Sequence, residues 1–468
     1  MWLDSHLLRR GPEERGASGG GVVDLSRRAF LVGAVGAAGA VALPSTSWAA
    51  AGTRVAEHPS EVALRWVETT YDLVLRENLS PPAAARVYAH TAIAMYEALV
   101  AGMPDRLPLA GQLTALRASG PVRHKQQVDW PSALVTAAAH VQRTLLPFAS
   151  PSTRPALDEA EATAIAARRH QVPAGRVDAG VAHGRAVGRH LAAWVARDGY
   201  GGTVGRVYEP STEGGARWES TPPNYRPAIE PHFFEVRPLV LRTADEVVPE
   251  PPVPFSAVPG SAFWQQAMAP YEQSKVNTDE QKAIARFWTD NPGSFTPPLG
   301  TPTGLPAGHW MLLGTQGLAL RGARLDLAVE TLALTGVALH EAFLNCWTWK
   351  YRFDLLRPIT YVRRYIDPAW TTLVNTPQFP EHTSGHSVAS PAAAVVLTAQ
   401  LGRFSFTDHS HDVRGHRPRS FDSFEDAAAE AAVSRLYGGI HYPQAIEAGL
   451  DQGREVGATV LARVRTRR

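Results

Sequence analysis

Small polar residues between two histidines form the most informative stretch of this sequence, PEHTSGHSVA at 380–389. The residues that follow are typical of a helix, and a helix start offers unpaired backbone N–H groups and the positive end of the helix dipole. Gly385 would let that backbone approach an anion closely, and Ser384 would add a hydroxyl donor. His386 can donate or accept a proton near neutral pH. The stretch therefore predicts an anion site with an acid–base group.

A pair of cations precedes this stretch, in WTWKYRFDLLRP. Lys350 and Arg357 are seven residues apart, so a single helix through both would present them on one face, about 10 Å apart along its axis. Pro358 would end that helix. A solvated basic stripe would also give this pattern, but the neighbouring Trp347 and Trp349 are large aromatic residues, which are not typical of a fully solvated helix face. The chain contains four lysines, so Lys350 is a selective choice over arginine.

A third cluster, SRLYGGIHYP, carries Arg435 and His441. On a straight helix these two side chains would point in different directions. The glycine pair at 438–439 permits a bend that lets both face one site. Each cluster alone is a weak signal. Together they predict a cradle for a tetrahedral oxyanion, in which arginine forks grip oxygens and one histidine bonds the central atom.

The order Lys-x6-Arg-Pro, Ser-Gly-His and Ser-Arg-x5-His resembles the vanadium-dependent haloperoxidases and the type 2 phosphatidic acid phosphatase superfamily. The soluble haloperoxidase branch is the more similar one, since PPAAARVYAHTAIAMYEA, ARFWTDNPGSFTPP and PAGHW also match it. The resemblance covers most of the chain after residue 50, with little support between 105 and 260. It implies an all-helical fold of two bundles, with the oxyanion site in one of them.

The resemblance also assigns roles to residues. It implies that vanadate is the cofactor and that hydrogen peroxide, a halide and a small organic acceptor are the reactants, giving a hypohalous species. The vanadate oxygens would be bound by Lys350, Arg357, Ser384, Gly385 and Arg435. His441 would be the metal ligand, and His386 the acid–base group beside it. Trp347 and Phe379 match aromatic positions near the halide in some members.

The same cradle would accept phosphate. In a secreted acid phosphatase, His441 would attack phosphorus and His386 would protonate the leaving oxygen. Lipid phosphatases of the superfamily mostly span membranes many times, and its secreted phosphatases are typically shorter than this chain. We therefore favour the haloperoxidase and keep the phosphatase as the alternative.

Two positions depart from the family pattern. Thr383 replaces the proline that usually precedes Ser-Gly-His, which changes backbone stiffness but removes no donor. Ala445 stands where the family usually has an aspartate, four residues after the third-motif histidine. Such a carboxylate would orient the helix or its histidine. We therefore expect either weaker activity or a substitute from another part of the chain.

Two other classes of protein were weighed. His382 and His386 have zinc-ligand spacing, but Thr-Ser-Gly between them lacks the catalytic glutamate of a zinc hydrolase helix. The loop DHSHDVRGHRPRS at 408–420 could suggest a metal or polyanion site, but we expect a solvated connection. A secreted anion-capture protein needs no proton shuttle such as His386. His90, His340 and Cys346 are expected to be packed core groups.

Helices dominate the elements that must position these residues. Apolar residues at helical spacing predict helices near 60–75, 81–102, 132–147, 155–170, 176–198, 278–288, 325–357, 386–401, 422–437 and 443–463. We predict an all-α protein with two four-helix-type bundles and long loops. The expected regions are a signal peptide at 1–49, helices at 50–200, Pro/Gly-rich loops and short helices at 201–310, and the site-bearing helices at 311–468.

Composition limits the partners. The 468 residues carry a net charge of +2, which gives no basic field for nucleic acid. Arg27 and Arg28 precede an apolar Ala/Gly-rich stretch ending at Ser47-Trp48-Ala49, which resembles a twin-arginine signal, so we expect a secreted or periplasmic protein. We expect no membrane span after signal cleavage, because the apolar run 332–339 is short. The sequence leaves the halide and the oligomeric state open.

Overall fold

The computed structural model describes residues 54–120, 127–208, 215–223, 225–290, 295–296, 301–302 and 304–468. The expected signal at 1–49 lies outside these residues. In the described part helices predominate, and the strands are short two-stranded pairs. The prediction of an all-α fold is confirmed.

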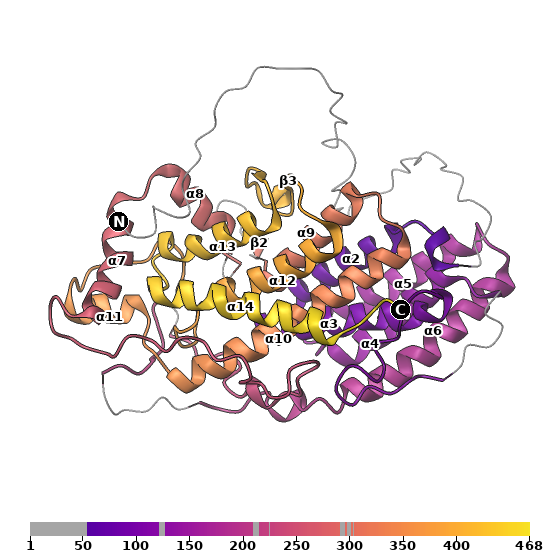
Figure 1. Cartoon of the computed structure of the whole chain (residues 1–468), viewed down its shortest axis with the longest axis horizontal. Helices are drawn as coiled ribbons and strands as arrows, with labels where there is room; N and C mark the ends of the chain where they lie inside the picture. Colours follow the sequence, from indigo (N-terminus) through magenta and orange to yellow (C-terminus); the bar gives the residue numbers. More distant parts are fainter. Residues whose placement is uncertain are drawn as a thin grey trace, which may run out of the picture.

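The N-terminal half forms one helical bundle, drawn in indigo to magenta in Figure 1. Two helix starts show why these segments are helical. The Ser80 hydroxyl caps α3 by accepting from the Ala83 N–H at 3.3 Å, and the Asp129 carboxylate caps α4 by accepting from the Ser132 N–H. The helices are α2 (Glu61–Glu77), α3 (Pro81–Leu99), α4 (Trp130–Leu145), α5 (Thr153–Arg169) and α6 (Ala174–Val195).

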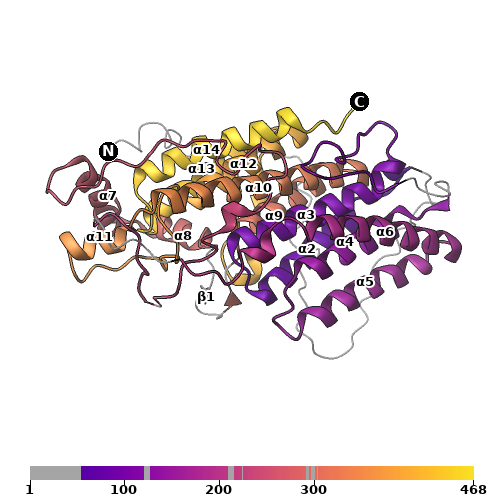
Figure 2. The same cartoon turned by 90° about the horizontal axis from the view of Figure 1, so that it is seen from below.

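The second bundle, in orange to yellow, carries the three sequence clusters. Its longest helix, α10, packs against α3 on one side and α12 on the other, so it joins the two bundles (Figure 2). The C-terminal tail returns to the first bundle, where the Leu107 N–H donates to the Thr466 carbonyl at 2.9 Å. The helices are α9 (Pro306–Leu320), α10 (Leu325–Phe353), α12 (Gly385–Leu401), α13 (Phe424–Tyr437) and α14 (Pro443–Arg463).

Among the shorter elements, α7 and α11 lie at the end of the second bundle away from the first (Figure 2). Thr278 and Gln281 form a capping box at the start of α8, in which the Thr278 hydroxyl accepts from the Gln281 N–H and the Gln281 side chain accepts from the Thr278 N–H. The two strand pairs are antiparallel, and Phe406 lies opposite Phe421 in the second. The elements are α7 (Ala262–Val276), α8 (Asp279–Phe287), α11 (Pro358–Tyr365), β1 (Phe295–Thr296), β2 (Thr301–Pro302), β3 (Phe406–Asp408) and β4 (Arg419–Phe421).

Close packing of α14 on α12 brings the second and third clusters together. Gly449, Gly453 and Gly457 lie on the α14 face that contacts α12, and a Cβ on Gly453 would lie 2.2 Å from the Val388 carbonyl oxygen. The bare backbone therefore allows the two helices to approach more closely than larger side chains would permit. As a result, the start of α14 lies beside the start of α12, where the Ser384 N–H donates to the Ala445 carbonyl at 3.0 Å.

The expectation of one helix through Lys350 and Arg357 is wrong. The helix α10 ends at Phe353, because Asp354 adopts a left-handed conformation with φ 48°. Arg357 is instead the N-cap residue of α11. The two cations still meet at one site, but a turn rather than a shared helix face brings them there.

The expectation of a solvated connection at 408–420 is also wrong in part. Asp408, His411 and Arg414 are buried, at 0%, 1% and 5% exposure. This segment packs against α9 and the end of α8, and its contacts are described below.

The helix α10 is long and apolar enough to cross a membrane by length and composition alone, although the sequence analysis identified only a short apolar run there. In the structure 94% of its most apolar window is buried inside the protein. Packing between the two bundles therefore accounts for its apolar character.

Candidate active site

The first turn of α12 forms the floor of the site. Ser384 is its N-cap residue, and its oxygen accepts from the Ser387 N–H at 3.3 Å and from the Ser387 hydroxyl at 2.8 Å. The Ser384 O–H therefore remains available as a donor. Gly385 follows, and a Cβ there would project toward Trp347 and Phe343, at 3.7 and 3.9 Å from their ring atoms. Glycine thus leaves the backbone at the helix start accessible.

His441 lies in the turn between α13 and α14 and faces this helix start. Its Nε2 is 3.0 Å from Arg357 Nη1, and its Nδ1 is 2.7 Å from Glu381 Oε1. Arginine has only donors, so Nε2 must accept and Nδ1 must carry the proton. Burial, with Arg357 and Lys350 nearby, holds the pKa of His441 well below its usual range. The ring is therefore neutral, with its lone pair on Nε2.

Arg357 and Lys350 differ in how many of their N–H groups are already hydrogen-bonded. Arg357 donates to the Phe379 carbonyl at 2.8 Å and the Ile440 carbonyl at 3.0 Å, and its buried Nη2 has no partner in the part of the chain that the structure describes. The Lys350 ammonium donates to three backbone carbonyls, those of Pro380 and Glu381 at 3.0 and 2.9 Å and that of Thr383. In this structure Lys350 therefore holds the loop before α12, and the free cationic donor belongs to Arg357.

The segment after α8 positions the remaining two predicted residues. Arg435 donates through Nη2 to the Trp288 carbonyl and through Nη1 to the Thr289 carbonyl at 3.4 Å. His386 also bonds the Trp288 backbone, while its buried Nε2 has no partner. Burial and the Arg435 charge hold the pKa of His386 well below its usual range. The neutral ring can therefore accept a proton at Nε2.

One pocket is lined by Gly385, His386 and His441, three of the predicted site residues. Trp347 and Phe379 form part of its wall, with ring centroids 4.7 Å apart. The two aromatic residues assigned to the halide thus lie beside the two histidines, and their role as a halide site stays a prediction. The walls are completed by Pro81, Asp290, Pro306, Phe343, Pro377 and Ile440.

Electrostatics around the pocket favour an anion. Lys350, Arg357 and Arg435 are all 0% exposed. Burial lowers the pKa of Lys350 to about 7 and that of Arg357 to about 10, so both arginines and a fraction of Lys350 are charged at neutral pH. The compensating carboxylates are Glu381, whose pKa burial raises to about 7, and Asp290. An oxyanion would offset the excess positive charge.

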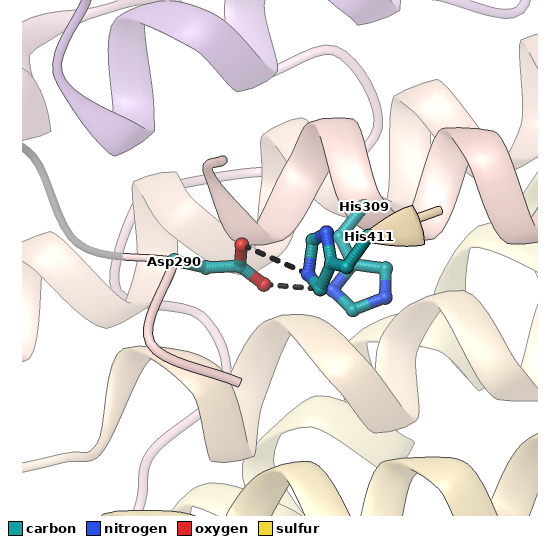
Figure 3. Close-up of side chains that lie close together, drawn as sticks. All are labelled: Asp290, His309 and His411. Atoms are coloured by element: carbon teal, nitrogen blue, oxygen red, sulfur yellow. Dashed lines mark hydrogen bonds and ion pairs between the residues drawn. The ribbon is translucent and has the colours of Figure 1, made fainter. Parts of the chain in front are cut away.

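A second buried cluster surrounds Asp290, which is itself a lining residue of the pocket (Figure 3). His309 Nδ1 is 2.7 Å from Asp290 Oδ2, and its Nε2 is 2.7 Å from Asp408 Oδ2. Burial alone would lower the pKa of His309. The negative charges of Asp408 and Asp290 outweigh burial and raise this pKa to about 10. His309 is thus an imidazolium that anchors Asp290, and through it the segment that holds Arg435 and His386.

Asp290, His309 and His411 could be considered as metal ligands, because their ligand atoms lie within 4.8 Å of one another. A ligating histidine must present a lone pair to the metal. Arg414 Nη1 donates to His411 Nδ1 at 3.0 Å, which places the His411 proton on Nε2, facing Asp290 at 3.5 Å. His309 is protonated at both nitrogens. The cluster therefore fits an ion-pair network better than a metal centre.

His382 does not share the pocket with His386. Its Nε2 instead lies 2.7 Å from the carbonyl oxygen of Glu250. The geometry therefore gives no support to a zinc site built from these two histidines. His90, His340 and Cys346 are buried, as expected.

A family model and a solved structure relate this chain to known proteins. The family model of the VCPO second helical-bundle domain matches residues 330–468. The crystal structure of a bacterial vanadium-dependent iodoperoxidase is similar with a TM-score of 0.82 and 32% identity, covering 87% of this chain and 97% of that one. This chain belongs to the vanadium-dependent haloperoxidase family.

Two further solved structures, the holo and apo types of a bacterial vanadium-dependent chloroperoxidase, have the same fold at lower sequence identity. A bacterial vanadium-dependent chloroperoxidase matches at 15% identity in its holo form, with a TM-score of 0.61 and coverage of 82% of this chain and 92% of that one. Its apo form matches with a TM-score of 0.62, 15% identity and coverage of 82% and 95%. A search of curated protein sequences found no match.

Sequence reasoning missed two residues of this haloperoxidase site. Glu381 lies inside the PEHTSGH stretch, but nothing in its spacing indicated a bond to a histidine 60 positions later. Asp290 lines the pocket and contacts His309, and it is a single acidic residue in a loop. Glu381 is the carboxylate that could compensate for Ala445.

Proposed function

We propose that this protein is a vanadate-dependent haloperoxidase that uses hydrogen peroxide to oxidise a halide to a hypohalous species. The observation that carries the proposal is the neutral His441 in the pocket lining, which has its lone pair on Nε2, the nitrogen beside Arg357 Nη1. An unprotonated nitrogen can give its electron pair to the central atom of an oxyanion, and the buried cations around it would stabilise the negative charge of the oxygens. Family membership and the iodoperoxidase neighbour support the same activity.

The residues present fit vanadate. Arg357 Nη2 and His386 Nε2 are buried polar atoms without partners among the described residues, and Gly385 leaves space that a Cβ would fill. We infer that Arg357, the Ser384 hydroxyl and the first backbone N–H groups of α12 bind its oxygens, and that His441 binds the metal. Bound vanadate would supply Lewis-acid activation of hydrogen peroxide.

The protein's own groups then have separate tasks. His386 can take a proton at Nε2, because burial and Arg435 keep it neutral. Lys350 fixes the loop that leads to Ser384, and Arg435 binds the segment whose backbone His386 also bonds. Trp347 and Phe379 exclude water from one wall and offer aromatic surface to a halide. Because the neighbour of 32% identity is an iodoperoxidase, iodide is the first halide to test.

The decisive experiment adds orthovanadate to the purified apo-protein and follows halogenation of a phenol-type dye with peroxide and iodide or bromide. A phosphate-ester assay without vanadate runs in parallel. We expect halogenation that depends on vanadate, and its loss in His441→Ala. His183→Ala is the control, because that histidine bonds the Ala98 carbonyl in the first bundle. Turnover only of the phosphate ester would favour the phosphatase and overturn the proposal.

A further inference from the structure

The start of α14 lacks a carboxylate that its geometry calls for. Tyr442 is the N-cap residue of α14, so Ala445 is at the third helical position. An acidic side chain at that position ordinarily reaches back to the N-cap N–H. Alanine offers no acceptor, and its backbone carbonyl is already bonded to the Ser384 N–H.

Glu381 supplies this acceptor from another segment of the chain. Its Oε1 accepts from the Tyr442 N–H at 2.9 Å and from His441 Nδ1 at 2.7 Å, and the residue is 0% exposed. One oxygen therefore satisfies the N-cap donor of α14 and fixes the histidine ring beside it. The Glu381 backbone is itself held, because Lys350 donates to its carbonyl at 2.9 Å.

The bond to Glu381 also decides which nitrogen of His441 carries the proton. An imidazole with its proton on Nδ1 has its lone pair on Nε2, and the carboxylate favours this tautomer by accepting the Nδ1 proton. On the other side of the ring, Arg357 Nη1 donates to Nε2 at 3.0 Å. Both neighbours thus select the same form of the ring, the one able to bond an electrophilic centre through Nε2.

We propose that Glu381 is the positioning residue of His441, replacing the missing carboxylate at position 445: it holds the ring with the proton on Nδ1 and so sets the affinity for a tetrahedral oxyanion. The affinity part rests on the proposed function. The tautomer part is a property of the protein without any ligand.

The tautomer is tested first, on the ligand-free protein. Histidine labelled with 15N reports directly which ring nitrogen carries the proton, and the spectrum of His441→Ala identifies the His441 signals. We expect a proton on Nδ1 and an unprotonated Nε2 in the wild-type protein. In Glu381→Met, which has similar length but no acceptor, we expect a larger share of the other tautomer, because Arg357 then favours the Nδ1-protonated form alone. A wild-type spectrum with the proton on Nε2 would overturn the proposal, and this measurement requires no variant of Glu381 to fold.

Affinity is tested by calorimetric titration of orthovanadate into the same proteins. We expect the dissociation constant to rise roughly 10- to 100-fold in Glu381→Met, the range found when the partner of a ligating histidine is removed. Glu381→Asp, which keeps the carboxylate on a shorter stem, should lose less. Wild-type affinity in Glu381→Met would also refute the proposal.

Glu341→Met is the matched control, because Glu341 is an equally buried glutamate that accepts from backbone N–H groups, those of residues 239–241. It should leave the His441 signals and the affinity unchanged, and an equal loss there would mean that general packing is responsible. If the wild-type protein fails to bind vanadate while the tautomer is as expected, the proposed function fails and the positioning role of Glu381 stands.

Discussion

Lys350 is the residue whose sequence-based role and structural contacts differ most. The motif predicts a direct bond to the oxyanion, whereas the structure directs its three N–H groups to the carbonyls of 380, 381 and 383. An ammonium group among carbonyl oxygens holds that loop in the conformation that places Ser384 and Gly385. Because burial brings its pKa to about 7, the charged fraction of Lys350 changes across the neutral range.

Lys350→Met separates these two roles. We expect the free energy of unfolding to fall by about 2 kcal/mol, since three buried carbonyls lose their donor. Vanadate affinity should fall as well, because the loop before α12 shifts. The measurement is urea unfolding together with calorimetric titration, and Lys282→Met, at a half-exposed helix position, is the control. Full stability with lost affinity would instead assign Lys350 a direct contact with the oxyanion.

At the scale of the elements, glycines spaced four apart decide how the site-bearing helices pack. Gly449, Gly453 and Gly457 line the α14 face toward α12. The same spacing recurs in the first bundle, where Gly180 and Gly184 of α6 face the backbone of the Asp129–Ala133 turn, with Cβ positions 2.4 and 2.3 Å from its carbonyl oxygens. Both bundles thus use bare helix faces to bring two helices into close contact.

Gly453→Ala should therefore disturb the site from a distance. Its new Cβ would lie 2.2 Å from the Val388 carbonyl oxygen and 2.6 Å from Pro391, so α14 must move away from α12. We expect a loss of about 1–3 kcal/mol in the free energy of unfolding and weaker vanadate binding. Gly175→Ala is the matched control, because its Cβ would meet nothing within 4 Å, and a gain of up to about 1 kcal/mol is expected there. Equal effects in both variants would contradict the packing argument.

The ion-pair cluster around Asp290 predicts an unusual titration. His309 bridges Asp290 and Asp408, and its pKa is raised to about 10. A folded-state pKa above the unfolded value means that the stabilisation is complete below pH about 6.5 and is lost as pH rises toward 10. The aspartates act oppositely: the pKa of Asp408 is lowered to about 2 by His309, so its contribution is lost as pH falls toward that value.

The histidine part of this prediction can be read by 15N NMR. We expect one imidazolium signal that persists to pH 9 and disappears from the spectrum of His309→Gln. The NMR titration is more specific than a curve of stability against pH. Lys350 has a lowered pKa, which changes stability in the opposite direction over the same pH range. A His309 midpoint near 6.5 would show that the two carboxylates do not hold the proton.

For the whole molecule, folding connects the proposed vanadate site with the proposed twin-arginine signal. The pocket is assembled from Pro81 and from segments between 290 and 441, so it exists only in the folded protein. Twin-arginine export transfers folded proteins, and we propose that this protein is exported by that route. The single cysteine, Cys346, is buried, so the fold requires no disulfide.

Replacement of Arg27 and Arg28 by lysine should retain the protein in the cytoplasm, because the pair is the feature that the export machinery reads. Fractionation of producing cells and immunodetection give the measurement. Lysine at Arg9 and Arg10, another arginine pair upstream, is the control and should leave export intact. Normal export of the first variant would contradict the assigned signal.

The sequence by itself determined the family and the helical class, because those depend on local periodicity and on residue types at fixed spacing. Ser384, Gly385 and His386 could be placed at a helix start for that reason. Only the tertiary structure decided that Arg357 opens α11, that Lys350 faces carbonyls, and that Glu381 orients His441. These depend on a single left-handed residue and on contacts across dozens of positions, which no local pattern encodes.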